Sequence, residues 1–161
     1  MSDPDEVLRR SLIRPERDQH GDLVLERVSD AVGASRVRSM PVVERMFRRG
    51  LLSERQCYAG LKIYECWAIG IVGARDADEG GSSVFDPAGV RDRQVIAAAE
   101  YRRIRDAVGG RMWPLAFSVS VEDWSVDRFS NERGGGMDRR QLMGVLKIAL
   151  DIAADALGLP P

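Results

Sequence analysis

The residues of this sequence whose type and spacing could do chemistry are five cations in its last third. They are Arg128, Arg133, Arg139, Arg140 and Lys147. A guanidinium group presents several N–H donors in one plane, so it can bind phosphate oxygens or the edge of a guanine with two hydrogen bonds. A lysine ammonium group binds phosphate as a point charge. If neighbouring helices present these side chains together, the sequence predicts contacts to a nucleic acid.

A short helix is predicted to carry the first two of these cations. Ser125 is a suitable N-cap, because its hydroxyl oxygen can accept a hydrogen bond from the first turn. Asp127 places an acid in that turn, where the helix dipole favours negative charge. Gly134 then ends the helix just after Arg133. Arg128 and Arg133 are expected to steady a nucleic-acid backbone from this position.

A long helix is predicted next, from about Arg139 to Leu157. Asp138 followed by Gln141 has the form of a capping box, with Asp in place of the usual Ser or Thr. Apolar residues then recur at steps of three and four and form one stripe that should face a core. The stripe consists of Leu142, Val145, Leu146, Ala149, Ile152, Ala153, Ala156 and Leu157.

The outer face of this long helix changes sign along its length. It carries Arg140, Gly144, Lys147, Asp151 and Asp155. Only its cationic first half could face a phosphate backbone. Residues 125 to 157 therefore have the form of a helix-turn-helix, in which the second helix enters a major groove with its N-terminal residues. A plain helical hairpin whose arginines are only solvated would show the same pattern.

The same stretch resembles the C-terminal domain of the phage-like activators of gene transfer agents. Members of that family have a similar "ERG" turn followed by a helix with an "L-x-L-A-L-D-x-L-A" face. The matching runs here are Val126 to Gly134, Val145 to Asp151 and Ala156 to Leu159. Upstream, Leu52 to Gln56 with Ala59 and Gly60 is similar to the opening helix of that domain, so the resemblance covers about residues 50 to 159.

This resemblance implies a transcription regulator whose helix-turn-helix looks like the promoter-reading domain of sigma factors. Family members usually have Trp-Pro after the glycine of the turn, where this chain has Gly135, Gly136 and Met137. The implied partners are double-stranded DNA and RNA polymerase or a sigma factor. Known activators of this type are larger, so the resemblance also implies a separate regulator chain. The expected role is to activate or antiterminate phage-derived genes.

Composition limits where a nucleic acid could bind. The 161 residues include 24 Lys or Arg and 25 Asp or Glu, which gives a net charge of −1. A globally basic nucleic-acid binder is therefore excluded, and any contact must come from a local patch. No stretch approaches the ~18 apolar residues of a membrane span, and the N-terminus lacks the apolar core of a signal peptide. The protein is expected to be cytoplasmic, with no membrane partner.

The sequence offers little for catalysis or metal binding. Cys57 and Cys66 lie on one predicted helix and point to opposite sides of it, so they cannot form a disulfide. His20 is the single histidine. The usual Cys and His donors therefore cannot assemble a metal cluster, and there is no nucleophile elbow or phosphate loop. We expect no enzymatic activity, no cofactor and no metal.

Periodicity and capping residues predict an all-α fold of about five helices over residues 39 to 161, preceded by a flexible arm at residues 1 to 38. Within the arm only Leu23 to Val28 resembles a short helix. The helices before the C-terminal pair are predicted at residues 41 to 49, 54 to 73 and 91 to 108, with a loop at 75 to 90. Residues 112 to 121 fit either a helix or an alternating strand, and we assign them to a helix because a lone strand would have no partner. The helix at 54 to 73 should bury a stripe made of Cys57, Leu61, Tyr64, Ala68 and Ile71.

Arg45, Arg48 and Arg49 lie just before the turn between the first two of these helices. A second nucleic-acid surface is one interpretation of this cluster. Packing of the helical hairpin onto the C-terminal pair is the interpretation that its large apolar surface favours.

A different class of function uses the same helices for assembly. A helical adaptor, or a DNA-packaging subunit like a small terminase, would act by self-assembly into a large ring. A monomer or dimer in solution would instead favour the regulator.

Overall fold

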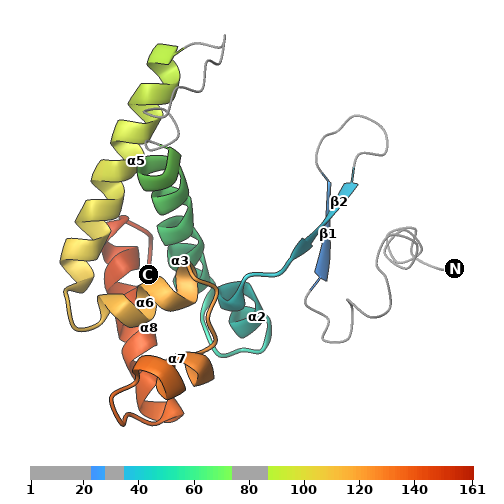
Figure 1. The fold of residues 1–161 in the computed structure, drawn as a ribbon, viewed down its shortest axis with the longest axis vertical. Helices are drawn as coiled ribbons and strands as arrows, with labels where there is room; N and C mark the ends of the chain where they lie inside the picture. The colour runs from blue at the N-terminus through green and yellow to red at the C-terminus, as the bar shows by residue number, and fades with distance from the viewer. Residues whose placement is uncertain (1–22, 28–34, 74–86) are drawn as a thin grey trace, which may run out of the picture. The chain divides into compact units, whose positions relative to one another are not determined.

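The computed structural model describes residues 23 to 27, 35 to 73 and 87 to 161 (Figure 1). The chain divides into two units, residues 1 to 41 and residues 42 to 161. The first unit contains an antiparallel hairpin of β1 (Leu23–Arg27) and β2 (Ser35–Ser39), in which Leu23 pairs with Ser39. The short helix predicted at Leu23 to Val28 is therefore wrong, because this segment makes ladder hydrogen bonds with a partner strand. The other residues of the predicted arm, up to residue 34, lie outside the described ranges.

The second unit is all-α, as the sequence predicts. Its described part consists of α2 (Val42–Arg48), α3 (Glu54–Trp67), the π-helical segment η1 (Ala68–Val72), α5 (Pro87–Val108), α6 (Trp113–Ser120), α7 (Val126–Arg133) and α8 (Arg139–Ala156). None of these helices is long and apolar enough to cross a lipid bilayer.

The observed helix boundaries agree with two of the predicted helices and differ from the prediction at the start of α5. The predicted helix at 54 to 73 is α3 continued by η1, and the predicted helix at 112 to 121 is α6. α5 begins at Pro87, so the predicted loop is wrong for residues 87 to 90. Proline is tolerated in a first helical turn because that turn has no intrahelical acceptor for its missing N–H. Residues 75 to 86 of the predicted loop lie outside the described ranges.

Helix α8 lies at the centre of the second unit, where α3, α5, α6 and α7 pack against it. Its buried residues are Leu142, Leu146, Ala149, Leu150, Ala153 and Ala154. Leu150 and Ala154 lie outside the predicted stripe, yet both are fully buried. The buried face is wider than one stripe because α3 and α5 both cover the helix.

Helices α3 and α5 run antiparallel and side by side, with η1 extending α3 along α5 (Figure 1). The buried residues of α3 are Gln56, Cys57, Ala59, Gly60, Ile63 and Cys66. The predicted stripe on this helix is therefore wrong in part: Cys57 is buried and Leu61 packs against the core, but Tyr64 is 49% exposed. Small residues allow α3 to lie close to its neighbours, so the larger side chains of the predicted stripe are left at the edge.

The contact between η1 and α5 is a close approach of two backbones. A Cβ atom added at Gly70 would lie 2.3 Å from the Ala98 nitrogen and 2.6 Å from its Cα. The side-chain amide of Gln94 also donates a 3.0 Å hydrogen bond to the Gly73 carbonyl. Glycine at position 70 is therefore required by the packing of η1 on α5.

The position of α2 depends on a hydrogen bond to a residue that is distant in the sequence, Asp123. The carboxylate of Asp123 accepts a 2.6 Å hydrogen bond from the backbone N–H of Val42, the first residue of α2. Asp123 adopts a left-handed backbone conformation, with φ at 57°. This contact satisfies an orphan donor of α2 and holds α2 beside the segment that leads into α7.

Replacing Leu146 with Ala tests the central position of α8. The Leu146 side chain is fully buried. Its truncation leaves a cavity, so we expect unfolding to become easier by about 2–5 kcal/mol. Chemical denaturation followed by circular dichroism measures this change. A midpoint that barely moves would contradict a core around Leu146.

Two Gly to Ala substitutions should have opposite effects on stability. Gly70→Ala forces a methyl group into the Ala98 backbone, and overpacking of this kind destabilises by about 1–3 kcal/mol or more. Gly144 lies inside α8, and a Cβ there would meet nothing within 4 Å. Gly144→Ala should therefore stabilise by about 1 kcal/mol through helix propensity. Thermal unfolding of the two variants checks both signs, and a stabilising Gly70→Ala would contradict the close approach.

Candidate nucleic-acid interface

The two C-terminal helices begin at the residues that the sequence predicts. The Ser125 hydroxyl oxygen accepts a 3.1 Å hydrogen bond from the Arg128 N–H at the start of α7. At the start of α8 the Asp138 carboxylate accepts a 2.8 Å bond from the Gln141 N–H, and the Gln141 side chain accepts a 3.1 Å bond from the Asp138 N–H. These caps set where each helix begins and so where its cations lie.

The turn between α7 and α8 requires glycine at two positions. Gly135 and Gly136 have φ values of 57° and 87°, which side chains rarely tolerate. The Met137 N–H donates to the Gly134 carbonyl at 3.0 Å, and the Ser130 hydroxyl donates to the Met137 carbonyl at 3.0 Å. The turn therefore has internal hydrogen bonds of its own and is fastened to α7.

The first half of α8 presents an open cationic face. Arg140 and Lys147 are exposed, and neither forms an ion pair with any described residue. Gly144 is exposed between them, with open space where a side chain would be. Arg139 is 62% exposed, and its Nε lies 3.4 Å from a carboxylate oxygen of Asp127 on α7. Three of the five predicted site residues therefore project from one end of one helix.

The other two predicted site residues are engaged on α7. The guanidinium carbons of Arg128 and Arg133 lie 4.0 Å and 4.4 Å from the centre of the Trp124 ring, which is a cation–π arrangement. Arg128 also pairs with Glu132 at 2.9 Å. Arg133 pairs with Glu122 at 3.1 Å. These contacts hold the Trp124 side chain against α7. Both arginines therefore have a structural role in addition to any contact with a ligand.

Arg133 also connects α7 to α6. Its guanidinium donates to the Ser118 hydroxyl at 3.2 Å, and that hydroxyl donates to the Glu122 carboxylate at 2.6 Å. Ser118 is fully buried, so this network satisfies a polar group that would otherwise be costly to bury.

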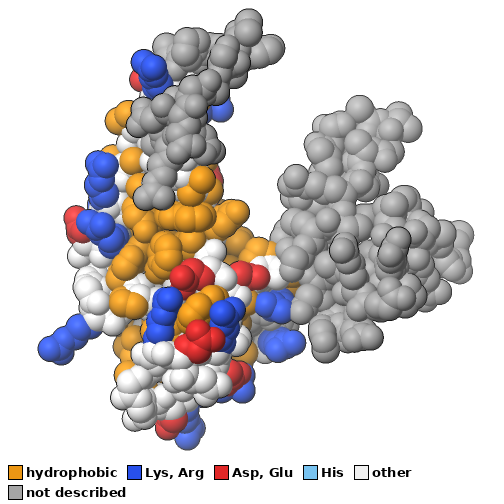
Figure 2. Space-filling model, viewed as in Figure 1, with side chains coloured by type: hydrophobic (Ala, Val, Ile, Leu, Met, Phe, Trp, Pro, Cys, Tyr) orange, Lys and Arg blue, Asp and Glu red, His pale blue; other side chains and the backbone are white. Residues whose placement is uncertain are grey.

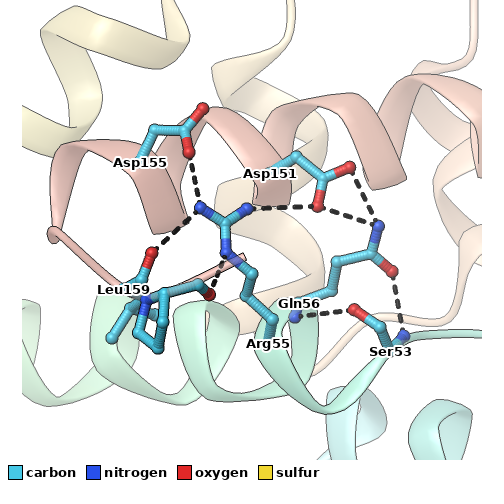
Figure 3. A network of polar contacts seen from close by, with 7 residues as sticks. Ser53, Arg55, Gln56, Asp151, Asp155 and Leu159 are labelled. Atoms are coloured by element: carbon cyan, nitrogen blue, oxygen red, sulfur yellow. Dashed lines mark hydrogen bonds and ion pairs between the residues drawn. The ribbon is translucent and has the colours of Figure 1, made fainter.

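The acidic side chains in the second half of α8 bind polar and basic side chains of α3 (Figure 3). The side-chain amide of Gln56 donates to both carboxylate oxygens of Asp151 at 3.1 Å. Arg55 pairs with Asp151 at 3.7 Å and with Asp155, and it donates to the Pro160 carbonyl at 2.9 Å. The negative charges of α8 are therefore partly neutralised within the unit, whereas its positive charges face outward.

These partners of α8 were not predicted from the sequence. Gln56 also completes a capping box at the start of α3, where its side chain accepts a 3.0 Å hydrogen bond from the Ser53 N–H. The sequence did contain an indication of a basic partner: Asp151 and Asp155 lie one turn apart on the helix, where two like charges repel each other unless a cation is nearby. Nothing local indicates that this partner is Arg55.

The structure places Arg45 and Arg49 near the first turn of α8. Arg45 and Arg49 line a hollow of about 130 Å³ together with Arg139 and the first residues of α7. A separate second nucleic-acid surface was one of the two interpretations of this arginine cluster, and packing of the hairpin onto the C-terminal pair was the favoured one. Figure 2 shows basic side chains over α2 and around α7 on one face of the unit. Two of the three α2 arginines therefore extend the cationic face of α8.

The cysteines lie elsewhere and are poor nucleophiles. Cys57 and Cys66 are free and buried. Burial, and to a smaller extent the nearby Glu100 carboxylate, raise the pKa of the Cys66 thiol to about 11. Burial also raises the pKa of Cys57. Both thiols are therefore protonated at neutral pH and react slowly.

The described ranges contain no group of three His, Cys, Asp or Glu side chains that could hold a metal ion. The cationic end of α8, with its neighbours from α2 and α7, is thus the arrangement with the clearest chemistry. No protein-family model matches this chain, and neither a curated protein nor a solved structure is significantly similar to it.

Proposed function

We propose that this protein is a transcription regulator that binds double-stranded DNA with the first half of α8. The observation that carries the proposal is the open face of Arg139, Arg140 and Lys147, which follows a short helix and a glycine turn. Its size and charge suit a major groove, where arginine side chains can bind guanine edges. The resemblance of the sequence to phage-like activators supports the same role.

The anchoring of α8 supports this proposal physically. Asp151 and Asp155 in the second half of the helix are fixed to α3, and the core holds Leu146 and Leu150. The first half projects from this anchored part without needing to fold on binding. A pre-organised contact surface avoids the entropy loss of ordering side chains and loops when the complex forms.

A protein partner fits the same proposal. The net charge of −1 gives little general attraction to DNA, so a few arginines must act locally. RNA polymerase, a sigma factor or a separate regulator chain would add contacts beyond those of α8. In that arrangement α8 supplies the sequence preference and the partner supplies much of the affinity.

The double substitution Arg139→Glu and Arg140→Glu tests the proposed recognition helix. Because one good bidentate base contact discriminates by about 1–3 kcal/mol, we expect specific binding to fall about tenfold or more. The helix should still form, because the helix dipole tolerates acids in its first turn. DNA fragments that co-purify with the wild-type protein provide the probe, and fluorescence anisotropy at two salt concentrations measures binding.

The matched control reverses two adjacent exposed arginines on α5, Arg102→Glu and Arg103→Glu. This control should keep wild-type binding, and circular dichroism should show that both double variants are folded. A folded Arg139/Arg140 variant that binds as tightly as wild type would exclude α8 as the recognition helix. A wild-type protein that binds polymerase or a sigma factor but no DNA would make this face a docking surface for those proteins.

The second candidate function is a self-assembling adaptor or a packaging subunit like a small terminase. The observation that favours it is a group of exposed apolar side chains: Ile69 on η1 is 39% exposed, and Val95 and Ile96 on α5 are 68% and 64% exposed. Figure 2 shows hydrophobic side chains gathered over α3, η1 and α5. Such a patch is typical of a protein–protein interface.

Mass in solution separates the two candidates. We expect a monomer or a dimer from native mass spectrometry or light scattering, because the regulator requires no larger assembly. A large ring would contradict the regulator and favour packaging. Val95→Asp together with Ile96→Asp should dissolve any such ring, since charge at the centre of an apolar contact is costly to bury.

A further inference from the structure

We propose that the hollow formed by Arg45, Arg49 and Arg139 is a phosphate-binding subsite for one phosphodiester group of bound DNA. This inference rests on the proposed DNA binding and adds a defined backbone contact beside the groove that α8 enters. The ligand group is a phosphate oxygen pair of the DNA backbone, and the contact is independent of base sequence.

The arginines of the hollow come from two helices and converge on one space. Arg45 lies in α2 and Arg49 directly follows its last residue, so the two are four residues apart and lie on one side of that segment. Arg139 enters from the first turn of α8. The hollow measures about 130 Å³. One water needs only ~10–15 Å³ of such space, so there is room for a group of several heavy atoms.

The hollow has a net positive lining. Its lining includes the side chains of three arginines and of one acid, Asp127. The apolar side chains of Met46 and Met143 complete it. Guanidinium groups form charge-assisted hydrogen bonds to phosphate, which are stronger than hydrogen bonds between neutral groups. The capped start of α7 adds the positive end of a helix dipole on the same side.

Asp127 holds Arg139 in place while the hollow has no ligand. The Asp127 carboxylate lies 3.4 Å from the Arg139 Nε, and the two side chains are 57% and 62% exposed. An ion pair this exposed contributes little to stability. A phosphate group would replace the carboxylate as the partner of Arg139, so Asp127 acts as a competitor of the ligand.

A phosphate contact at this place would also set how α8 enters the groove. Contacts to phosphates fix the register and orientation of a protein on the duplex, while contacts to base edges select the sequence. The Val42 N–H bond to Asp123 holds α2 in a fixed place relative to the start of α7. The spacing between the phosphate subsite and the base-reading residues Arg140 and Lys147 is then fixed by the fold.

The test compares four single variants of the full chain on a short, labelled duplex of random sequence. Arg49→Ala and Arg45→Ala remove cations from the hollow, and Asp127→Asn removes the competing charge while keeping the side-chain shape. Arg102→Ala, on α5 and outside the hollow, is the matched control. Anisotropy titrations between about 50 and 200 mM salt give the affinity and its salt dependence. Circular dichroism confirms that each variant is folded, and Arg49→Ala remains informative if Arg45→Ala destabilises α2.

The proposal expects Arg49→Ala to bind about tenfold more weakly, as for the loss of a hydrogen bond to a charged group. The slope of log affinity against log salt should fall by about 0.9, the value for one phosphate contact. Asp127→Asn should bind more tightly than wild type, and Arg102→Ala should match wild type.

Other results separate failure of the subsite from failure of DNA binding. If Arg49→Ala behaves like Arg102→Ala while the double variant Arg139→Glu, Arg140→Glu loses binding, the subsite is excluded and DNA recognition by α8 stands. If Asp127→Asn binds more weakly than wild type, the Asp127 carboxylate does not compete with DNA phosphate, and the proposed subsite is excluded as well. If wild type binds no duplex at any salt concentration, both the subsite and the proposed function are excluded.

Discussion

The burial of α8 among its neighbours is the interaction on which the rest of the second unit depends. Leu146, Ala149, Leu150 and Ala153 are fully buried, and the alanines allow α3 and α5 to approach the helix closely. Each neighbouring helix thereby takes its position from α8. In the first turn Leu142 is also buried, so only the outer side of that turn, with Arg139 and Arg140, is left exposed. The packing that stabilises the fold therefore also determines which part of α8 a ligand can reach.

Much of this arrangement follows from local sequence, and what does not follow depends on distant contacts. The caps formed by Ser125 and by Asp138 with Gln141 are local hydrogen bonds, so sequence predicts both helix starts correctly. The stripe predicted on α3 missed the buried Ala59, Gly60 and Ile63, because small residues such as Ala59 and Gly60 give little hydrophobic signal even where close packing requires them. Likewise, no local pattern in η1 indicates that another backbone would lie 2.3 Å from a Cβ at Gly70.

The candidate site likewise has one part that follows from local sequence and another that depends on contacts between distant residues. That Arg140 and Lys147 share the outer face of α8 follows from helical periodicity alone, and the cap at Asp138 places Arg139 in the first turn. That Arg128 and Arg133 cover Trp124 depends on how the chain folds back before α7, so spacing could not separate these two arginines from the others. The arrival of Arg45 and Arg49 beside Arg139 depends on the Val42 N–H bond to Asp123, whose partners are far apart in the sequence.

The distribution of charge gives this nearly neutral chain a local preference for an anion. Asp151 and Asp155 are held by Arg55 and Gln56, so the acids of α8 contribute little field outside the unit. At the other end of the helix the lining of the hollow includes three arginines and one acid, Asp127. Because screening limits the reach of exposed charges to about 8 Å at physiological salt, this local excess decides binding more than the net charge does. An anionic ligand should therefore be attracted to the α2, α7 and α8 end of the unit even though the chain as a whole carries a charge of −1.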